Sequence, residues 1–422
     1  MNILHISDLR GSDGGVNAVL RLHNGLKKRG IDSRVICASG IGEPSEFIQV
    51  KNWRLERKLY SLLGKISYPA GLNKFIDPTT LRILNNKACR EADVLTIHGP
   101  TYNFLSYLAM PLLTRDKPAL FPVYDMWSFT GHCYQSLECD KWKTGCGRCP
   151  HPEIFPSIKR DDTHLEWKLK NWAYAHSKLY VIVPSKWLEV QIRSSMLGKF
   201  PVYRIPHGID TESYKPFDPG MCRSLIGIPD NKKVLMFMAA DLGNYIKGGD
   251  LLVNALQSLP RSLKDEIVLL LVGFNGREIA RSVDIQVINF GYVASDRLKS
   301  ILYSAADLFI HPARGEILSL AILESMSCGT PVAAFSIGGN PDAIHDGITG
   351  LLAEPENVEK MAENIIMMLN DNLLRSDMRD NCRNTILKEF SVDRQIARYI
   401  ELYEQVMQPR PLSVQISERI VG

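Results

Sequence analysis

The stretch of sequence that decides the fold is PARGEILSLAILESMSCGTPV, residues 312–332. Its pattern predicts the end of a strand, a loop, a short helix and the next strand. Ser319 is placed to cap the helix at its N-terminus, and Gly329 with Pro331 supplies the matching stop. A loop that meets a helix N-terminus at the carboxyl end of a parallel strand binds anions, because free N–H groups and the helix dipole point outward. We therefore expect an anion site here.

Two carboxylates flank the expected anion site. Glu316 lies in the loop before the helix, and Glu324 lies about one turn inside it. A carboxylate beside a phosphate is electrostatically unfavourable, so we expect both groups to accept hydrogen bonds from sugar hydroxyls. The alternative for isolated residues of this kind is a solvated carboxylate on a helix surface.

Short apolar runs alternate with amphipathic helical stretches along most of the chain. This alternation predicts an α/β protein with parallel sheets covered by helices on both faces. The predicted strands are residues 1–8, 35–37, 94–97, 119–124 and 179–183 in a first set, and residues 234–238, 267–272, 286–290, 307–311 and 331–335 in a second. A turn-rich segment, residues 205–219, separates the two sets. We therefore predict two domains, residues 1–207 and 208–390, and a C-terminal helix that packs back toward the first domain and ends in a tail, residues 391–422.

Length and composition bound the class of protein. A chain of 422 residues can form two hydrophobic cores, and 45% hydrophobic with 23% charged residues is typical of globular proteins. A formal net charge of +4 is too small to indicate nucleic-acid binding. The N-terminus lacks the basic region of a signal peptide and meets Asp8 early, and the longest apolar run, residues 104–113, is interrupted by Pro111. These features predict a cytoplasmic protein.

Several ordered motifs resemble the family-4 glycosyltransferases of the GT-B fold. The spacing Glu316-x7-Glu324, followed by a Cys-Gly-x-Pro-Val run, is that family's signature. Further matching motifs are IPHGID at 205–210, KGGD at 247–250, GGNPD at 338–342 and DGITGLL at 346–352. The resemblance implies two Rossmann-like domains whose parallel sheets face an inter-domain cleft, with a nucleotide sugar held by the C-terminal domain.

The resemblance also implies roles in the donor site. Glu316 contacts the hydroxyls of the donor sugar, Glu324 contacts the nucleotide ribose, and Lys247 pairs with the diphosphate of a UDP-, GDP- or ADP-sugar. The chemistry agrees, because one preorganised cation or N–H donor at the leaving diphosphate contributes about 2.7–4 kcal/mol. The alternative for Lys247 is an exposed lysine at a helix start.

Two departures from the family pattern concern the phosphate contacts. Residues 241–246 lack the arginine that family members often place ahead of the lysine. Ile317, Leu318 and Ser319 replace the usual Gly-Phe-Gly, so the loop that faces the phosphates is expected to be Leu318, Ser319 and Leu320.

In the N-terminal half, Gly14 and Gly15 follow the first predicted strand and precede an amphipathic helix at 16–28. Their backbone can approach the cleft closely, and we assign both to the donor site; a plain tight turn is the equal alternative. The pattern is not G-x-G-x-x-G, so a nicotinamide or flavin cofactor loses its main support.

Residues 124–150 resemble a subgroup of family-4 enzymes, the colanic-acid-type exopolysaccharide transferases, which carry HDxWxxTGxC…C…KTGCxxCP. The family histidine that reaches the donor sugar near the reacting carbon is Tyr124 here. Asp125 is retained and is assigned a catalytic role. His98 ends a neighbouring predicted strand and is placed on the acceptor side, with a satisfied structural histidine as the alternative.

Four cysteines lie within 17 residues: Cys133, Cys139, Cys146 and Cys149. They could hold a structural Zn²⁺, but one C-x-x-C pair with otherwise loose spacing makes free thiols an equal alternative. The remaining cysteines suit buried free thiols: Cys37, Cys89, Cys222, Cys328 and Cys382. The resemblance implies no catalytic metal or other catalytic cofactor, because lysine and helix N-termini can neutralise the diphosphate.

Residues 51–65 carry five basic side chains against one acidic side chain, with leucines on one helical face. Such a helix can lie on an anionic membrane at its inner, cytoplasmic face, which would suit a polyprenyl-linked acceptor. A core-packing helix with a basic outer face is the alternative.

The resemblance implies a retaining transferase that moves a sugar from a nucleotide diphosphate to a hydroxyl of a bacterial surface glycan or lipid-linked oligosaccharide. The expected route is front-face displacement, in which the departing phosphate helps to deprotonate the acceptor. Two alternatives remain open. One is a catalytically silent binding protein, motivated by Tyr124 and residues 317–319, and the other is a sugar-nucleotide epimerase or phosphorylase of the same architecture.

Overall fold

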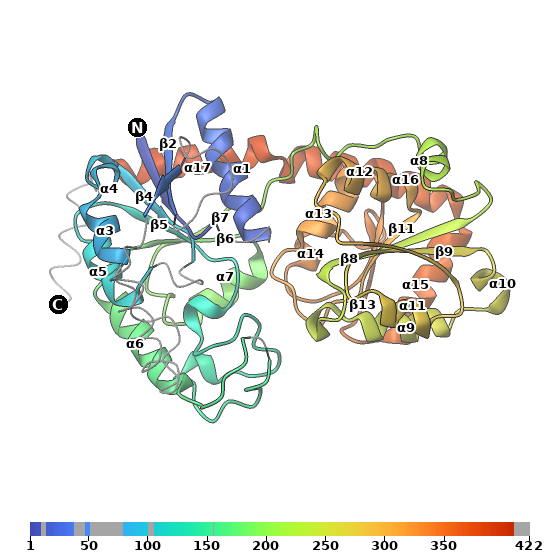
Figure 1. Ribbon diagram of the computed structural model, residues 1–422, viewed down its shortest axis with the longest axis horizontal. Coiled ribbons are helices and arrows are strands. Elements are labelled where there is room, and N and C mark those ends of the chain that lie inside the picture. The colour runs from blue at the N-terminus through green and yellow to red at the C-terminus, as the bar shows by residue number, and fades with distance from the viewer. Residues whose placement is uncertain (10–13, 38–46, 51–78, 100–104, 155, 409–422) are drawn as a thin grey trace.

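The computed structural model describes residues 1–9, 14–37, 47–50, 79–99, 105–154 and 156–408. The chain forms two lobes that lie side by side, each built on a parallel sheet with helices on both faces (Figure 1). The first lobe holds a seven-stranded sheet of order β3-β2-β1-β4-β5-β6-β7, and the second holds a six-stranded sheet of order β10-β9-β8-β11-β12-β13. The predicted fold class, α/β with two Rossmann-like domains, is confirmed.

The strands are short and mostly buried. The first sheet consists of β1 (Asn2–Ile6), β2 (Asp32–Cys37), β3 (Phe47–Gln49), β4 (Val94–Ile97), β5 (Ala119–Pro122), β6 (Tyr180–Val183) and β7 (Val202–Arg204). The second consists of β8 (Lys233–Asp241), β9 (Ile267–Phe274), β10 (Gln286–Gly291), β11 (Leu308–His311), β12 (Val332–Phe335) and β13 (Gly350–Ala353).

Among the described residues, helices connect most successive strands, as expected of parallel pairing. In the first lobe they are α1 (Gly14–Lys28), α3 (Thr79–Asn85), α4 (Lys87–Glu91), α5 (Met110–Leu113), α6 (Thr163–Ala175) and α7 (Lys186–Arg193). In the second they are α8 (Pro219–Leu225), α9 (Gly249–Gln257), α10 (Arg261–Lys264), α11 (Arg277–Ser282), α12 (Asp296–Ala305), α13 (Leu320–Ser327), α14 (Asn340–Ala343), α15 (Val358–Asn370) and α16 (Asn372–Thr385). The last helix of the chain is α17 (Val392–Met407). Short turns of 3-10 helix are η1 (Tyr107–Ala109), η2 (Trp127–Phe129), η3 (Lys141–Lys143) and η4 (Tyr245–Lys247), and η5 (Ile386–Phe390) is a π-helical turn.

Both sheets reverse their strand order at one point, between β1 and β4 in the first lobe and between β8 and β11 in the second. Chain connections on either side of such a point run to opposite faces of the sheet, which leaves a crevice at the carboxyl ends of the strands. His98 follows β4, and His311 ends β11. The fold therefore creates two crevices, one in each lobe.

Each sheet separates two layers of apolar side chains. In β8, Val234 and Met236 face the cluster that includes α12 and α13, whereas Leu235 and Phe237 face the cluster that includes α9 and α15. This alternation follows from the two-residue period of a strand, and burial on both faces explains why the strands read as continuous apolar runs.

Two passages of the chain connect the lobes, and they lie against each other. The backbone N–H of Ile209 donates to Phe390 O (2.8 Å), and that of Val392 donates to Ile209 O (2.9 Å). A Cβ atom on Gly208 would come within 2.6 Å of Val392 Cα, so glycine permits this close approach. The linker that leaves the first lobe is thus held to the segment that returns to it.

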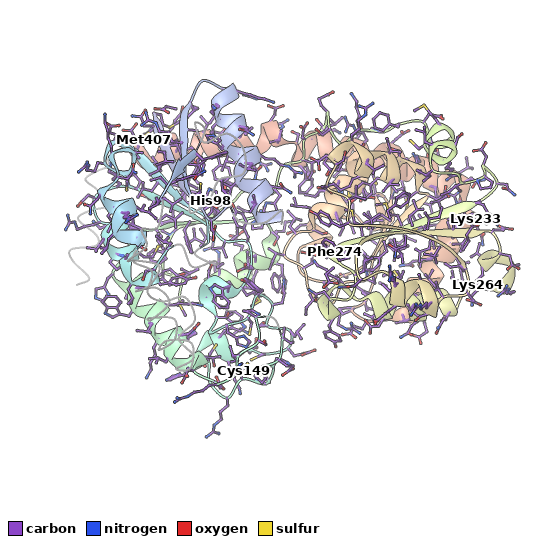
Figure 2. All side chains as sticks on the ribbon, in the orientation of Figure 1. His98, Cys149, Lys233, Lys264, Phe274 and Met407 are labelled. Carbon is purple, nitrogen blue, oxygen red and sulfur yellow. The ribbon has the colours of Figure 1, made fainter. Side chains whose placement is uncertain are left out.

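Helix α17 returns from the second lobe and packs on the first (Figure 1). Its buried Ile396, Tyr399 and Tyr403 join the cluster that contains Leu22 and Leu26 of α1. The C-terminal end of α17 therefore lies over the first lobe, where Figure 2 labels Met407.

Ten strands of the sheets were predicted from apolar runs, and the structure contains them with shifts of a few residues at their ends. Three strands were missed. β3 and β7 are three-residue strands at the edges of the first sheet, and β13 lies within the motif DGITGLL. Edge strands bury less apolar surface, so their sequences lack a continuous apolar run.

Two predicted features, the basic stretch at 51–65 and the tail after residue 408, lie outside the described residues. Among the residues that the structure describes, none of the helices has both the length and the apolar character needed to cross a membrane.

Candidate functional site

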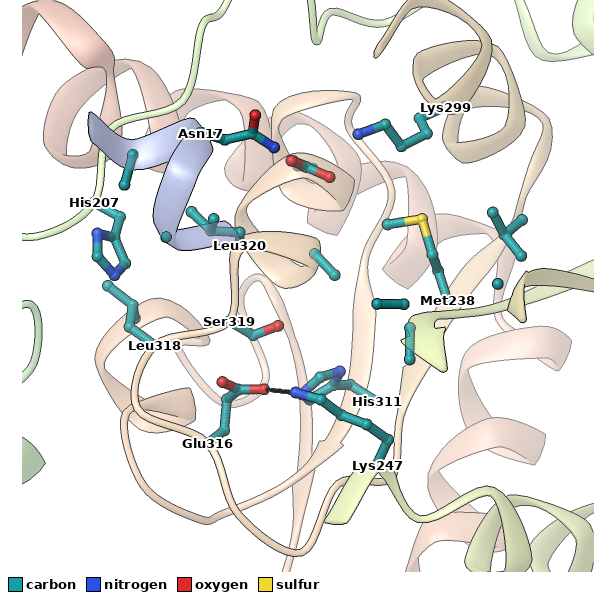
Figure 3. Close-up of a pocket in the computed structure, with 18 of the residues that line it drawn as sticks. Asn17, His207, Met238, Lys247, Lys299, His311, Glu316, Leu318, Ser319 and Leu320 are labelled. Atoms are coloured by element: carbon teal, nitrogen blue, oxygen red, sulfur yellow. Dashed lines mark hydrogen bonds and ion pairs between the residues drawn. The ribbon is translucent and has the colours of Figure 1, made fainter. Parts of the chain in front are cut away.

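A cavity of about 340 Å³ lies between the two lobes, at the carboxyl ends of β8 and β11 and beside the start of α1 (Figure 3). The polar residues that line it are Asn17, Tyr124, His207, Lys247, Tyr292, Lys299, His311, Glu316, Ser319 and Glu324. Its volume is in the range of small-molecule sites. The cavity brings together two lysines, two carboxylates and the N-terminus of α13.

Lys247 enters the cavity from a tight turn after β8. The side chain of Asn244 caps this turn by accepting a hydrogen bond from a backbone N–H (2.9 Å). Gly248 then adopts a left-handed conformation (φ 70°), and a Cβ atom there would lie 1.9 Å from the Pro312 carbonyl oxygen. Glycine is therefore required for the Lys247 turn to pack against the loop that carries Glu316.

Arg314 ties these two loops together. Its guanidinium donates to both carboxylate oxygens of Asp250 (2.6 and 2.8 Å) and to Glu356 (3.1 Å), and it lies over the ring of Tyr245 at 4.0 Å. Bidentate pairing of this kind fixes geometry as well as charge. Sequence analysis found no arginine in residues 241–246. The structure brings one from a different loop, where it braces the Lys247 turn.

Lys247 and Glu316 form an ion pair inside the cavity, with Nζ 2.8 Å from Oε2 (Figure 3). The Nε2 atom of His311 lies 3.4 Å from the same oxygen. Burial alone would raise the pKa of Glu316, but the charge of Lys247 and the contact with His311 lower it well below the usual range for a glutamate. Glu316 is therefore an anion at neutral pH, and the charge of Lys247 balances its negative charge.

The first two residues of α13, Leu320 and Ala321, line the cavity, so the N-terminus of this helix lies at the cavity wall. Ser319 caps the helix as predicted, because its Oγ accepts a hydrogen bond from Ile322 N (3.4 Å). Leu318, Ser319 and Leu320 all line the cavity. The backbone N–H groups of the first turn therefore lie where an anion would meet them.

Glu324 lies on the same helix, on the side that faces the first lobe. Its Oε1 is 3.4 Å from Arg21 Nη2 on α1, and its Oε2 accepts a hydrogen bond from Tyr303 OH (3.4 Å). Burial raises the pKa of Glu324, and the charges of Lys299 and Arg21 act against that rise. The pair with Arg21 crosses from one lobe to the other.

A second cavity, of about 210 Å³, lies in the first lobe and is lined by His98 and Asp125. Gly15 and Tyr124 line both cavities, so the two are adjacent. Gly14 begins α1. Asp125, to which the resemblance assigns a catalytic role, lines this second cavity beside His98.

A buried chain of hydrogen bonds runs inward from Tyr124. Its OH lies 2.7 Å from His98 Nδ1, and His98 Nε2 lies 2.9 Å from His5 Nδ1. Burial raises the pKa of Tyr124 above its ordinary range and lowers the pKa of His98 to about 3. The pKa of His5 is also well below its ordinary value, through burial and the neighbouring imidazoles. Figure 2 labels His98 in the interior of the first lobe.

Two buried histidines, His98 and His207, should make the folded protein less stable in mild acid. The folded protein keeps His98 neutral down to about pH 3 and His207 down to about pH 4, because burial lowers both pKa values. The unfolded chain takes up those protons near pH 6.5. The free energy of unfolding should therefore fall as pH drops from about 6.5 to 4, by up to about 1.4 kcal/mol per pH unit for each histidine.

The measurement is urea unfolding between pH 7 and 4.5, for the wild type and for His98→Asn. Glu324, with its raised pKa, acts in the opposite direction but is common to both proteins. The variant should therefore show a shallower pH dependence. Equal slopes in the two proteins would contradict the assignment of a neutral, buried His98.

The four cysteines of residues 133–149 lie around a separate small cavity of the first lobe, near the place where Figure 2 labels Cys149. None of the nine cysteines forms a disulfide bond. Those predicted to be buried are buried: Cys37, Cys89, Cys222, Cys328 and Cys382.

Sequence reasoning missed several residues of the main cavity. His311 ends β11. A histidine at the carboxyl end of a parallel strand could have been predicted to line the cavity, because ligands bind at that edge of the sheet. His207 lies in the motif IPHGID, where it was read as a linker residue. Lys299 and Arg21 lie on amphipathic helices, and nothing in their local pattern separates them from surface cations.

Comparison with family models divides the chain in the same way as the two sheets. Residues 12–213 match the model described as "Glycosyltransferase Family 4", and residues 224–385 match the model described as "Glycosyl transferases group 1".

Individual relatives show a similar pattern. The chain is 31% identical over 173 residues to a D-inositol 3-phosphate glycosyltransferase of Actinosynnema mirum, a match that covers 38% of this chain and 41% of the relative. The chain spans about half or less of the length of the curated relatives that it matches. Among solved structures, it resembles sucrose-phosphate synthase from Thermosynechococcus elongatus (TM-score 0.71, 18% identity, 96% of this chain and 99% of the other). It also resembles Anabaena HepE in complex with UDP (TM-score 0.67, 17% identity, 96% and 100%).

Proposed function

We propose that the chain is a retaining glycosyltransferase, because residues 12–213 match a family 4 glycosyltransferase model and residues 224–385 match a group 1 glycosyltransferase model. The donor is a nucleoside diphosphate sugar. The acceptor is a hydroxyl of a bacterial surface glycan or of a lipid-linked oligosaccharide. No catalytic metal takes part, because protein groups supply the positive charge that the leaving diphosphate needs.

The observation that carries the proposal is the convergence of Lys247, Glu316 and Glu324 on one cavity between the lobes. Lys247 and the N-terminus of α13 provide positive charge for the diphosphate, which carries the charge released when the glycosyl bond breaks. Glu316 accepts hydrogen bonds from the sugar, and Glu324 accepts them from the ribose. When the donor binds, it replaces the internal contact between Lys247 and Glu316.

The relation between the two cavities supports transfer with retention. They meet at Gly15 and Tyr124, and Gly15 lies in the first turn of α1. An acceptor in the second cavity would reach a sugar in the first past Gly15 and Tyr124, and front-face displacement requires that it does so on the side of the leaving diphosphate. The departing phosphate can then take the acceptor proton.

UDP-sugars are the first donors to test, because HepE was solved in complex with UDP and with UDP-glucose. The surface-glycan acceptor rests on the resemblance of residues 124–150 to exopolysaccharide transferases.

The decisive experiment combines binding with turnover. Thermal unfolding is followed with UDP-, GDP- and ADP-sugars, because a ligand at 100 times its Kd stabilises the folded state by about 2.7 kcal/mol. The stabilising donor is then incubated with lipid-linked acceptors from a membrane extract, release of nucleoside diphosphate is measured, and the anomer of the product is read by NMR. A product with inverted configuration, or no stabilising donor, would contradict the proposal.

A second candidate function is donor binding without turnover. One observation favours it: Tyr124 occupies the position of the family histidine, and its hydroxyl is already engaged by His98 (2.7 Å). Stabilisation by a donor without release of nucleoside diphosphate, over all acceptors tested, would support this second function.

A further inference from the structure

The segment between η2 and α6 has little regular structure. Over residues 131–162 the described part of the chain contains one short 3-10 helix, η3. Two residues other than glycine, Leu137 and Arg148, have φ values of 49° and 47°, and Gly145 and Gly147 also have positive φ. Conformations of this kind persist where surrounding contacts over-determine them. Among the described residues, the backbone hydrogen bonds of a helix or sheet do not provide those contacts. Buried Trp142 and the hydrogen bond from Cys149 N to Asp161 (2.6 Å) supply some of them, and a bound ion would add to them.

The side chains that converge inside this segment are of the types that bind metal ions in proteins. Cys133, Cys139, Cys146 and Cys149 line a cavity of about 20 Å³ together with His132. Single ligand atoms of His132, Cys133 and Cys149 all lie within 4.8 Å of one another. Zn–S and Zn–N bonds of about 2.3 and 2.0 Å place ligand atoms roughly 3.5–4 Å apart, so the set closes around one ion if the His132–Cys149 pair, now 3.1 Å apart, opens slightly and any wider pair contracts. The cavity has room for one water-sized body.

The hydrogen bonds of His132 are those expected of a histidine that binds a metal ion through Nε2. Its Nδ1 lies 3.3 Å from the Pro156 carbonyl oxygen, which can accept but not donate. Nδ1 therefore carries the proton in the neutral ring, and the lone pair of Nε2 points toward Cys149 Sγ at 3.1 Å. A ring that donates one N–H to a carbonyl while it offers the other nitrogen is the usual arrangement of a metal-bound histidine.

Charge also favours a metal–thiolate cluster here. Lys170 is fully buried, and its Nζ donates to the carbonyls of Trp127 (2.8 Å) and Thr130 (2.9 Å), directly before this segment. It interacts electrostatically with Cys133 and Cys146. Lys170 is also paired with the equally buried Glu166 (4.0 Å), so it offsets only in part the single negative charge of Zn²⁺ with three thiolates and one neutral imidazole. The backbone N–H of Gly131 donates to Cys146 Sγ (3.3 Å), a contact that stabilises a thiolate.

We propose that residues 131–162 bind one structural zinc ion through His132, Cys133 and Cys149, with a fourth ligand from Cys139 or Cys146. Binding releases the three thiol protons to solvent. Zinc suits a closed tetrahedral set of nitrogen and sulfur ligands. The ion takes no part in sugar transfer, and the zinc proposal does not depend on the proposed glycosyltransferase function.

The zinc site would position a wall of the cleft between the lobes. Residues 135–138, between Cys133 and Cys139, line a further cavity of about 400 Å³ that Gly315 and Glu316 also line. The side chain of Gln135 packs so closely on Gly315 that a Cβ atom there would lie 3.3 Å from it. The metal would therefore hold this wall against the loop that carries Glu316.

The first test is the metal content of the full-length protein, purified without chelators and measured by mass spectrometry. The wild type should hold one zinc per chain. Cys133→Ser, Cys149→Ser and His132→Ala should hold at least tenfold less, whereas Cys222→Ser, which removes a buried thiol in the second lobe, should retain one. A zinc-free wild type would overturn the proposal. Full zinc in His132→Ala, with loss in Cys133→Ser, Cys149→Ser and the further variants Cys139→Ser and Cys146→Ser, would overturn the histidine ligand in favour of four thiolates.

A second measurement guards against variants that fail to fold. Zinc is released from the wild type with a mercurial reagent and measured with a chromogenic chelator, while circular dichroism reports secondary structure and limited proteolysis reports cleavage sites. We expect release of one zinc, unchanged helix content, and new cleavage within residues 131–162. Unchanged protection of this segment after full release would overturn the positioning role.

Discussion

Replacement of Lys247 by alanine should lower turnover by about 10²–10³-fold, because one cation at the developing diphosphate charge is worth roughly that factor. The structure makes the lysine hard to replace. Its turn depends on Gly248 and on the brace of Arg314 with Asp250, so a nearby cation cannot move to the same point. Steady-state rates of nucleoside diphosphate release measure the effect. Affinity for the free nucleoside diphosphate should fall as well, since the lost contact is to the phosphates.

The matched control for this variant is Lys360→Ala. It breaks another lysine–glutamate pair, Lys360 with Glu363 (3.0 Å), on the exposed surface of α15. An exposed pair contributes little, so turnover and stability should stay near wild type. Near-normal turnover in Lys247→Ala would mean that the diphosphate is neutralised elsewhere, for instance by Lys299.

Replacement of Glu316 by glutamine should lower turnover by a similar factor of about 10²–10³ but with a different binding pattern. The change keeps the volume of the side chain and removes its charge, and Lys247 is exposed enough, at 32%, to be hydrated without its partner. Because Glu316 is assigned to the sugar, affinity for the nucleotide sugar should fall while affinity for the free nucleoside diphosphate is retained or increased.

Calorimetric titration with both ligands separates the two roles. Equal loss of affinity for the nucleotide sugar and the free nucleotide would place Glu316 at the phosphates and contradict its role. The double variant Lys247→Ala with Glu316→Gln should lose less than the product of the single effects, because the two side chains contact each other.

The strands and the donor motif could be predicted because each depends on local sequence. Continuous apolar runs mark strands buried on both faces, and the cap at Ser319 with the stop at Gly329 marks the helix between β11 and β12. Arg21 and Lys299 join the cavity through packing of helices that are distant in sequence, and a local pattern carries no information about such contacts.

The paired connection at Ile209 and Val392 has a consequence for how substrates enter. Two backbone segments that are hydrogen-bonded to each other define one axis, and the lobes can rotate about it with dihedral changes in only a few residues. Rotation would separate Arg21 from Glu324 and open the cavity between the lobes, whereas the cavity lined by His98 and Asp125 keeps its own walls in the first lobe. A donor bound to the second lobe would then be enclosed when α1 swings over it, so we expect an ordered reaction in which the donor enters first and the spent nucleotide leaves last.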